Sequence, residues 1–496
     1  MTPDAFAASR GCFEALCTVL GEDGTGRLEH GDIEARLAGD GRELLRQLMQ
    51  DHLDLRAVRE QRLPVVRDAQ QVAHATVETG HQRPLTTIFG QVQVNRMAYR
   101  ARDTNNLYPA DAGLNLPLEK HSHGLRRMAA VEASRGSYDE DVQAIERASG
   151  QRIGKRQVEQ LAIRAAADFN AFYTTRQPPA GASSELLVLS CDGKGIVMRP
   201  DALRPATAKA AAKATGKLAT RLSKGEKRNR KRLAELGVVY DATPAPRSPD
   251  DILPATAEQR AAAAPGPDIA NKWLTASVVD QAAAVVGQIF DEAQRRDPGH
   301  TRTWIALVDG NNHQIDRINT EADDRGIQVP ILIDFIHVVE YLWKAAWCFH
   351  HEGDPAAEAW VAGKARAILA GNARRVATSI RRQATTARLS TARRAGADTC
   401  ATYLTNKTPY LDYPTALADG WPIATGVIEG ACRHIVADRL DITGARWGLT
   451  GAEAILKLRA LRSNGDFDTY WTWHQAQERR RVHQTRYADN ALPQAA

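Results

Sequence analysis

Apolar and polar positions alternate in two different ways along the chain. Over residues 1–80, apolar side chains recur at the three- and four-residue spacing of amphipathic helices, and residues 125–176 return to that spacing. Between them, residues 85–100 are rich in β-forming side chains around Gly90, which predicts a small β-hairpin. The Pro-, Gly- and Ser-containing segment 177–184 predicts a linker. The first part of the chain is therefore expected to be mainly helical.

The part of the chain after the linker alternates between strands and helices. Strands are predicted over residues 186–198, 237–242, 272–280, 303–310 and 329–339. The fifth strand runs into another helix, and two further amphipathic helices are predicted over residues 281–296 and 313–326. The resulting order, β-β-β-α-β-α-β-α, is that of an α/β RNase H-like domain with a mixed sheet.

These patterns divide the chain into four segments. We expect a mainly α N-terminal region with a small β-hairpin at residues 1–180. The RNase H-like domain is expected from residues 185–340 together with 421–462, and an all-α insertion at 341–420 would interrupt it after the fifth strand. The chain would end in a basic C-terminal tail at residues 463–496.

Two short helices within the N-terminal region, over residues 137–167, resemble a helix-turn-helix. Ser137 and Glu140 have the spacing of a capping box, which predicts a helix from Tyr138 to a turn at Gly150. An ordinary helical hairpin is the alternative. In a helix-turn-helix, basic residues at the start of the second helix would contact DNA, and here these are Arg152, Lys155 and Arg156.

The composition is that of a globular protein without a membrane span. The chain has 496 residues, of which 43% are hydrophobic and 25% charged. It has no uninterrupted apolar run near the roughly 18 residues that a membrane span needs. We see no signal peptide at the N-terminus. The six cysteines form no CxxC pair, which disfavours a disulfide framework or a zinc knuckle and fits a reducing cytoplasm.

Positive charge is concentrated in three clusters, although the net charge is only +6. Residues 199–232 contain twelve Lys or Arg and two acids, residues 361–394 contain nine Lys or Arg and no acid, and residues 479–486 add four arginines. Such clusters indicate a polyanion partner, while each alone is also compatible with a solvated helix face. The expected DNA contacts in the first cluster are Lys224, Lys227, Arg228, Arg230, Lys231 and Arg232.

Acidic residues interrupt two of the predicted strands. Asp192 lies in the middle of the first strand and Asp309 at the end of the fourth, each after an apolar run. A carboxylate in such a place is costly unless it is paired or binds a cation, although single acids at strand ends are commonly turn or cap residues. The two strands are neighbours in an RNase H-like sheet, and hard oxygen ligands suit Mg²⁺ or Mn²⁺.

A third carboxylate is needed for phosphoryl transfer by two metal ions about 4 Å apart. We choose Glu429, near the start of a predicted helix that follows the helical insertion. Its competitors are Glu340, Glu352 and Glu358, which precede Glu429 in the chain.

Several longer segments resemble the Kra-type insertion-sequence transposases of bacteria. The resemblance lies in CDGKG (191–195), KRLAELGVVYDATPAPRSPDDI (231–252), the FDEAQRRDP and WIALVDGNNHQ runs (290–314) and TGVIEGACRHIVADRLDITGARW (425–447). It also touches LYPADAGLNLP and the SYDEDV to SGQRIGKRQVE segment, so it covers nearly the whole chain. These enzymes belong to the DDE transposases and have broader kinship with the Mutator-like group.

The resemblance implies a metal-dependent DNA transposase. Two Mg²⁺ (or Mn²⁺) ions on Asp192, Asp309 and Glu429 would support strand cleavage to a 3′-OH and transfer of that end to target DNA. The implied partners are double-stranded DNA, as terminal repeats and as target, and further copies of the chain in a homodimer or higher oligomer. The protein would act in the bacterial cytoplasm at the nucleoid, with no membrane partner, and its N-terminal region would bind the DNA ends.

Other residues are expected around this site. DFIH (334–337) resembles the DxxH element of Mutator-like enzymes; at this spacing Asp334 and His337 share a helix face, and either a phosphate contact or a structural hydrogen bond would suit His337. Further candidates for lining the site are His313 and Gln314. Arg433 would hold a phosphate, and contacts to DNA by charge and by base stacking are expected from Arg446 and Trp447, with surface packing as the alternative.

Two other functions stay open at this point. The chain would be an inactive, transposase-derived DNA-binding protein if the acids no longer support turnover, or an RNase H-like nuclease if it cuts without joining. A P-loop and a GxSxG motif are both missing from the sequence, which leaves ATPase and serine-hydrolase functions without support.

Overall fold

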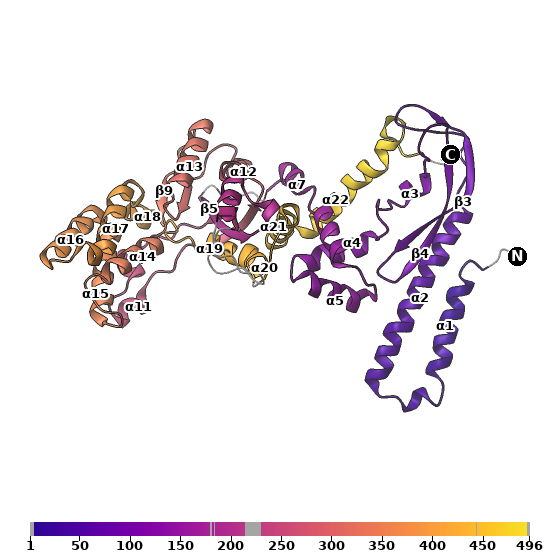
Figure 1. Cartoon of the computed structure of the whole chain (residues 1–496), viewed down its shortest axis with the longest axis horizontal. Coiled ribbons are helices and arrows are strands. Elements are labelled where there is room, and N and C mark those ends of the chain that lie inside the picture. Colours follow the sequence, from indigo (N-terminus) through magenta and orange to yellow (C-terminus); the bar gives the residue numbers. More distant parts are fainter. Residues whose placement is uncertain (1–3, 179–180, 183, 214–229, 443, 494–496) are drawn as a thin grey trace. The chain divides into compact units, whose positions relative to one another are not determined.

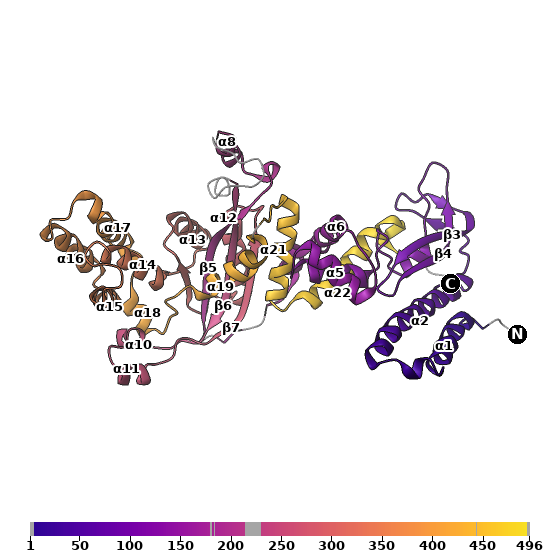
Figure 2. The same ribbon diagram turned by 60° about the horizontal axis from the view of Figure 1, so that its bottom comes forward.

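The computed structural model describes residues 4–178, 181–182, 184–213, 230–442 and 444–493, and the chain folds into two compact units (Figures 1 and 2). The first unit combines Met1–Thr175 with Asp466–Ala496, and the second is Arg176–Gly465. The boundary after Thr175 lies next to the predicted linker. The expected separate tail at 463–496 is wrong, because most of this segment completes the first unit.

The first unit begins with a helical hairpin and continues into β-structure. Helix α1 (Ala7–Leu20) packs along α2 (His30–Val58), and the Ser9 hydroxyl donates a 2.5 Å hydrogen bond to Asp51 of α2. The helix expected up to residue 80 ends at Val58. The next elements are strands: β1 (Val66–Arg67), β2 (Ala73–His74) and β3 (Thr76–Thr86). β3 pairs with β4 (Gln91–Arg100) almost from end to end. This pairing stabilises an extended conformation in residues whose helical periodicity is weak.

The predicted hairpin around Gly90 is confirmed, with a longer first strand than expected. Gly90 has a φ of 146°, which only glycine adopts without strain, and the turn is closed by a hydrogen bond from the Thr87 amide to the Gly90 carbonyl. One face of the hairpin forms a small core with α2 and the following loop, made by Leu53, Leu85, Val92, Val94 and Leu116.

Helices fill the rest of the N-terminal segment. After α3 (Pro109–Gly113), these are α4 (His123–Ala133), α5 (Tyr138–Ser149), α6 (Lys155–Ala165) and α7 (Phe169–Thr175). The predicted capping box is present, because the Ser137 hydroxyl accepts from the Glu140 amide and the Glu140 carboxylate accepts from the Ser137 amide. Gly150 ends α5 in the left-handed conformation. Both α5 and α6 pack against α4, so the two predicted helices belong to a three-helix cluster.

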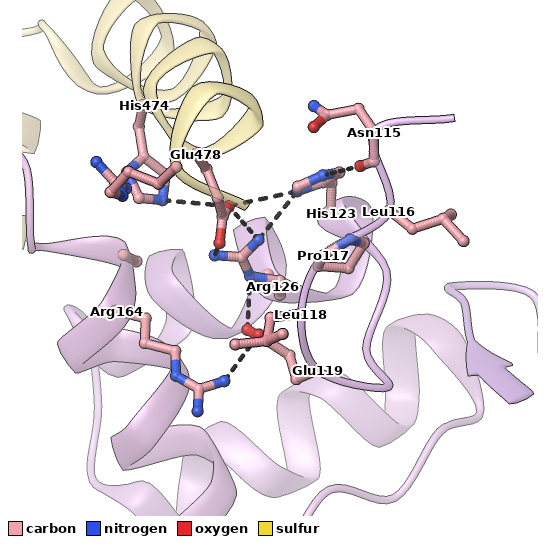
Figure 3. A network of polar contacts seen from close by, with 12 residues as sticks. Asn115, Leu116, Pro117, Leu118, Glu119, His123, Arg126, Arg164, His474 and Glu478 are labelled. Atoms are coloured by element: carbon pink, nitrogen blue, oxygen red, sulfur yellow. Dashed lines mark hydrogen bonds and ion pairs between the residues drawn. The ribbon is translucent and has the colours of Figure 1, made fainter. Parts of the chain in front are cut away.

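The C-terminal helix α22 (Phe467–Val482) joins the first unit through a buried polar network (Figure 3). Arg126 of α4 is fully buried; its guanidinium contacts both carboxylate oxygens of Glu478, one of them at 2.8 Å, and lies 3.0 Å from Glu119. His474 lies 2.6 Å from Asp168, and Glu478 lies 3.8 Å from the other His474 nitrogen. These contacts fix the C-terminal segment in place.

The second unit is a mixed α/β structure built on a five-stranded sheet. The strand order is β7-β6-β5-β8-β9; β5, β8 and β9 are parallel, and β6 and β7 are antiparallel to their neighbours. The strands are β5 (Leu186–Val197), β6 (Lys231–Ala242), β7 (Ile269–Ser277), β8 (Trp304–Val308) and β9 (Ile331–Ile333). With α12 (Ala282–Arg296) and α13 (Asn312–Arg325), the predicted order β-β-β-α-β-α-β-α is confirmed.

The predicted helical insertion after the fifth strand is also confirmed. It consists of α14 (Phe335–Ala346), which begins directly after β9, and then α15 (Pro355–Leu369), α16 (Ala373–Thr386), α17 (Thr391–Lys407) and α18 (Tyr413–Ala418). α14 and α17 approach closely at Gly396, where a Cβ atom would lie 2.3 Å from the Lys344 carbonyl oxygen. The chain then returns to the sheet through α19 (Gly426–Ala431), a π-helical turn (Cys432–Ala437), α20 (Asp438–Leu440) and α21 (Leu449–Ser463).

Small helices occupy the connections of the sheet: α8 (Pro205–Lys213) follows β5, and α10 (Pro249–Ile252) and α11 (Ala257–Ala262) follow β6. A search of the described helices for one that could cross a membrane, by length and apolar character together, finds no candidate.

Candidate active site

Three aspartates lie on or directly after the three parallel strands: Asp192 within β5, Asp309 directly after β8 and Asp334 directly after β9. Continuing the β5–β8 register by three residues brings Asp192 opposite Asp309, and continuing the β8–β9 register by one residue brings Asp309 level with Asp334. The Asp334 amide donates a 2.8 Å hydrogen bond to the Val308 carbonyl, which holds that alignment. Parallel strands thus gather the three carboxyl groups at one edge of the sheet.

Glu429 reaches the same edge from the other side of the helical insertion. It lies on α19, which packs against β5 and β6. The segment before α19 is tied to the insertion's first helix by a 2.9 Å hydrogen bond from the Phe335 amide to the Ile423 carbonyl. In this way the return of the chain to the sheet brings Glu429 close to Asp334.

Asp334, His337 and Glu429 form a compact group. Each offers a ligand atom, and these atoms all lie within 4.8 Å of one another. The Thr425 hydroxyl stands between the two acids, 2.5 Å from Asp334 Oδ2 and 3.0 Å from Glu429 Oε1. One hydroxyl proton cannot be donated to two carboxylates at once. A proton or a cation between the two acids would satisfy the second carboxylate.

Asp192 is linked to this group through Cys432. The Cys432 thiol lies 3.1 Å from Asp192 Oδ2, and Cys432 belongs to the π-helical turn directly after Glu429. Burial and the charge of Asp192 raise the pKa of Cys432, so the thiol stays protonated and donates to the carboxylate. A π-helical turn of this kind is common at functional sites.

Asp309 is held by its own turn and by the helical insertion. Its Oδ1 accepts a 2.8 Å hydrogen bond from the Asn311 amide, and its carbonyl accepts one of 3.3 Å from the Tyr403 hydroxyl of α17. Tyr403 stacks on Tyr341 of α14 with ring centroids 3.9 Å apart. The pKa of Cys191 is raised by burial and by the charges of Asp309 and Asp192, which places both carboxylates near this thiol.

The expected triple and the compact group are therefore not the same set. In the part of the chain that the structure describes, the compact group contains Glu429 with Asp334 and His337, and does not include Asp192 or Asp309. Of the competitors for the third carboxylate, Glu352 and Glu358 are exposed in and after the α14–α15 loop. Glu340 is also exposed, on α14, and its charge contributes to the raised pKa of His337.

The electrostatics of His337 depend mainly on its contact with Asp334. Its ring lies 3.7 Å from Asp334, and this contact raises its pKa above 6.5; burial opposes the rise, and the charges of Asp309 and Glu340 add to it. The pKa of Asp334 is lowered despite its burial, by contacts from His337 and Thr425. These two shifts favour an imidazolium beside a carboxylate.

We expect this pair to make the stability of the metal-free protein pH-dependent. Because the pKa of His337 is raised in the folded state, its contribution is complete below about pH 6.5 and is lost as the pH rises through the folded pKa. Urea unfolding in EDTA, followed at increasing pH, should show this loss in the wild type and a flatter profile in His337→Gln. Equal slopes for the two proteins would contradict the assignment.

The other residues expected at the site are less closely involved. Gln314 is buried in α13, whereas His313 beside it is exposed. Arg433 is 82% exposed and lies 4.0 Å from Asp438. Arg446 is exposed. These arginines are accessible to a partner from solvent, and none of the described contacts assigns them to the carboxyl cluster.

Trp447 is not available for base stacking in this structure, which corrects the expectation. It is buried, its indole nitrogen donates to the Leu440 carbonyl at 3.0 Å, and the Arg439 guanidinium lies 4.7 Å from its ring centroid. Its backbone pairs beside the end of β5 at Met198. The aromatic side chain therefore packs within the loop that joins α20 to α21.

The first basic cluster is only partly described, and two of its members make contacts within the chain. Lys224, Lys227 and Arg228 lie outside the described residues, and Arg230 stands in the turn before β6. Lys231 and Arg232 begin β6 itself. Their charges serve internal contacts, with Asp441 at 3.1 Å and with the Val278 carbonyl at 2.7 Å. Strand pairing, and not a mobile basic loop, fixes these two residues.

The candidate DNA contacts of the three-helix cluster are exposed. These are Arg152, Lys155 and Arg156, at and before the start of α6. Lys155 also pairs with Asp139 of α5. Their accessibility is compatible with a nucleic-acid contact and does not by itself establish one.

Sequence reasoning missed four residues around the carboxyl cluster: Thr425, Cys432, Tyr403 and Glu235. Glu235 faces Gly193 across the β5–β6 pair, and its pKa is raised by burial and by the nearby Asp192 charge. TGVIEG, in which Thr425 stands four residues before Glu429, contains a signal for the Thr425 contact, because that spacing puts two side chains on one helix face. The other three depend on packing between distant segments.

Comparison of the sequence with protein-family models and with curated proteins gave no match.

Proposed function

We propose that the protein is a DDE-type DNA transposase that cleaves the ends of an insertion sequence and transfers them to target DNA. The observation that carries the proposal is the register that brings Asp192 of β5 level with Asp309 after β8 and Asp309 level with Asp334 after β9, with Glu429 brought next to Asp334 after the helical insertion. Asp192, Asp309 and Glu429 are the acids that the resemblance to Kra-type transposases implies, and Asp334 is a further acid beside them.

The sheet supports an RNase H-like catalytic domain. Its first strand lies at the centre, its second and third strands continue antiparallel on one side, and its fourth and fifth continue parallel on the other. The first and fourth strands, which carry Asp192 and Asp309, are neighbours. The insertion separates Glu429 from the other acids by sequence, as expected for such an enzyme.

The donor set fits hard divalent cations. Most of the possible ligand atoms are carboxylate oxygens, and the His337 imidazole lies close enough to join them. The Thr425 hydroxyl has one proton for the two carboxylates of Asp334 and Glu429, so a cation would satisfy the carboxylate that receives no proton. Asp192, Asp309 and Glu429 would hold two Mg²⁺ or Mn²⁺ ions, with Asp334 available as a further oxygen ligand. When bound, such ions supply Lewis-acid activation of the attacking oxygen and charge stabilisation on the leaving oxygen.

The surrounding side chains orient this cluster. Cys432 donates to Asp192, the Thr425 hydroxyl lies within hydrogen-bond distance of both Asp334 and Glu429, and Tyr403 anchors the turn that carries Asp309. His337, with its raised pKa, is suited to contact a phosphate oxygen as an imidazolium. The phosphate chain of double-stranded DNA is the substrate class that matches two clustered metal sites and the exposed basic surfaces of the chain. A homodimer or higher oligomer follows from the need to handle two DNA ends together.

The test is a strand-transfer assay with the full chain and a labelled duplex of its own terminal repeat. We expect cleavage and joining with Mg²⁺ or Mn²⁺ and no reaction in EDTA. Ca²⁺ should support binding with little cutting, because its looser coordination holds the two-ion geometry poorly. Full cleavage in EDTA would overturn the proposal. Cleavage without joining would favour the nuclease, and specific binding without cleavage the inactive DNA-binding protein.

A further inference from the structure

The outward face of helix α16 carries an unusual row of arginines. Its inward face is apolar and buried through Val376, Ala377, Ile380 and Ala384. The outward positions are basic or hydroxylic, and the exposed arginines are Arg374, Arg375, Arg381, Arg382 and, just past the end of the helix, Arg388. We call these five residues the α16 arginine face. One face of α16 thus packs in the core of the helical insertion, and the opposite face exposes the arginines to solvent.

The α16 arginine face has no carboxylate partners. Among the residues that the structure describes, no acid lies within 4.0 Å of any of the five guanidinium groups, and Arg381 donates a hydrogen bond to the Thr402 hydroxyl at 3.1 Å. Nearby arginines behave differently: Arg366 pairs with Asp250 at 2.8 Å, and Arg394 with Asp398 at 2.7 Å. The positive charge of the face is therefore not neutralised within the described chain.

Helix α16 is held rigidly, so the arginines project from a fixed support. The Trp360 indole donates to Gln383 at 2.9 Å, and the Lys364 ammonium donates to Ser379 at 2.7 Å, both from α15. On its other side α16 packs along α17. A rigid row of cations loses little conformational freedom when it binds a polyanion.

We propose that the α16 arginine face binds the phosphate backbone of duplex DNA outside the catalytic centre. The inference rests on the proposed function and extends it to a second contact surface. Arg374 and Arg381 are spaced by seven residues, two helical turns, and the helix of 14 residues is about 21 Å long at about 1.5 Å per residue. Guanidinium groups bind phosphates well, and contacts of this kind position DNA without reading its sequence.

The composition of the face favours DNA over a membrane surface. A helix that lies on a lipid surface presents apolar residues next to its basic ones. Here the apolar residues of α16 are buried in the protein, and the exposed residues between the arginines include Thr378 and Thr385. The exposed side of α16 therefore has no large apolar side chain that could insert among acyl chains. Binding to a phosphate backbone requires only the positive charges of the arginines.

The position of α16 predicts a dependence on DNA length. α16 packs on α17, and α17 reaches the candidate site through the bond from Tyr403 to Asp309. In both views α16 lies at the edge of the helical insertion, away from the sheet (Figures 1 and 2). A short duplex held at the carboxyl cluster would therefore end before it reaches α16, and a longer duplex would extend over both.

The experiment compares the full wild-type chain with the triple variant Arg374→Gln, Arg375→Gln, Arg382→Gln. Binding of a labelled mixed-sequence duplex of about 40 base pairs, roughly 140 Å long at about 3.4 Å per base pair, is followed by fluorescence anisotropy over a series of salt concentrations. Three lost phosphate contacts should reduce the slope of log K against log[salt] by about 2.7. A duplex of roughly 10 base pairs should bind both proteins with similar slopes.

A control variant with the same loss of charge is Arg27→Gln, Arg102→Gln, Arg260→Gln, which removes three scattered exposed arginines. It should keep the wild-type slope, and thermal unfolding should show that both variants fold. An unchanged slope in the α16 variant would overturn the inference, as would a preference of the face for duplex RNA or for anionic vesicles over DNA. If the slope changes but no protein cuts DNA, the surface stands and the proposed activity fails.

Discussion

Replacing Asp192 or Asp309 with Asn, or Glu429 with Gln, is expected to reduce strand cleavage and strand transfer by at least about 1,000-fold. Each change keeps the shape of the side chain and removes one negative charge from the edge of the sheet. Folding should survive, because clustered acids repel one another without a cation. DNA binding should persist or become tighter, since an acid near a phosphate is lost. Cleavage rates on a labelled terminal-repeat duplex measure the effect.

Two further variants make this result specific. Glu358→Gln changes an exposed acid of α15 and should keep wild-type activity. Asp334→Asn tests whether the compact group of the structure is catalytic, because Asp334 contacts Thr425 and His337 within it. An active Glu429→Gln together with an inactive Glu340→Gln would move the third carboxylate onto α14. Full activity in all three principal variants would exclude this edge of the sheet as the active site.

Replacing Arg126 with Met is expected to destabilise the first unit by about 3–5 kcal/mol, the usual effect of removing one partner from a buried ion pair. Arg126 is 1% exposed and contacts both Glu478 and Glu119. Burial alone would raise the pKa of Glu478, and the contact with Arg126 lowers it. Without the guanidinium, Glu478 would be left with the more distant His474 and His123 rings, at 3.8 and 4.0 Å, while Glu119 would keep Arg164 at 2.7 Å (Figure 3). Chemical unfolding followed by the tryptophans of α22 measures the change.

The neighbouring residue supplies a matched control. Arg127 pairs with Asp468, but the side chains are 46% and 80% exposed, so solvent screens the pair. Arg127→Met should therefore cost no more than about 1 kcal/mol. If Arg126→Met costs equally little, the network in Figure 3 does not hold α22 in the first unit.

Much of the second unit follows from local sequence pattern. Buried strands such as Trp304–Val308 are continuous apolar runs, and the amphipathic helices between them show their period directly. Asp192 and Asp309 could be assigned to one edge because strand order brings the first and fourth strands together. Asp334 and His337 were predicted to share a helix face, and their 3.7 Å contact confirms it.

Interactions between distant segments account for what the sequence did not reveal. The polar C-terminal segment looked like a solvated tail because its partners lie far away in sequence, as Arg126 does for Glu478. Trp447 looked available for stacking because nothing local showed that Arg439 and the end of β5 enclose it. The strands after Val58 were missed because short strands gain their stability from pairing, here with β4, rather than from their own periodicity.

The second unit is one uninterrupted stretch of chain, whereas the first is made from both ends, and this determines the order in which a newly synthesised molecule can fold. Chains emerge from the ribosome N-terminus first. All of Arg176–Gly465 is released before α22, so the carboxyl cluster can assemble while Arg126 still awaits Glu478. A gene copy shortened anywhere before the codon for Asp466 would encode an incomplete first unit, even if every residue of the three-helix cluster were present.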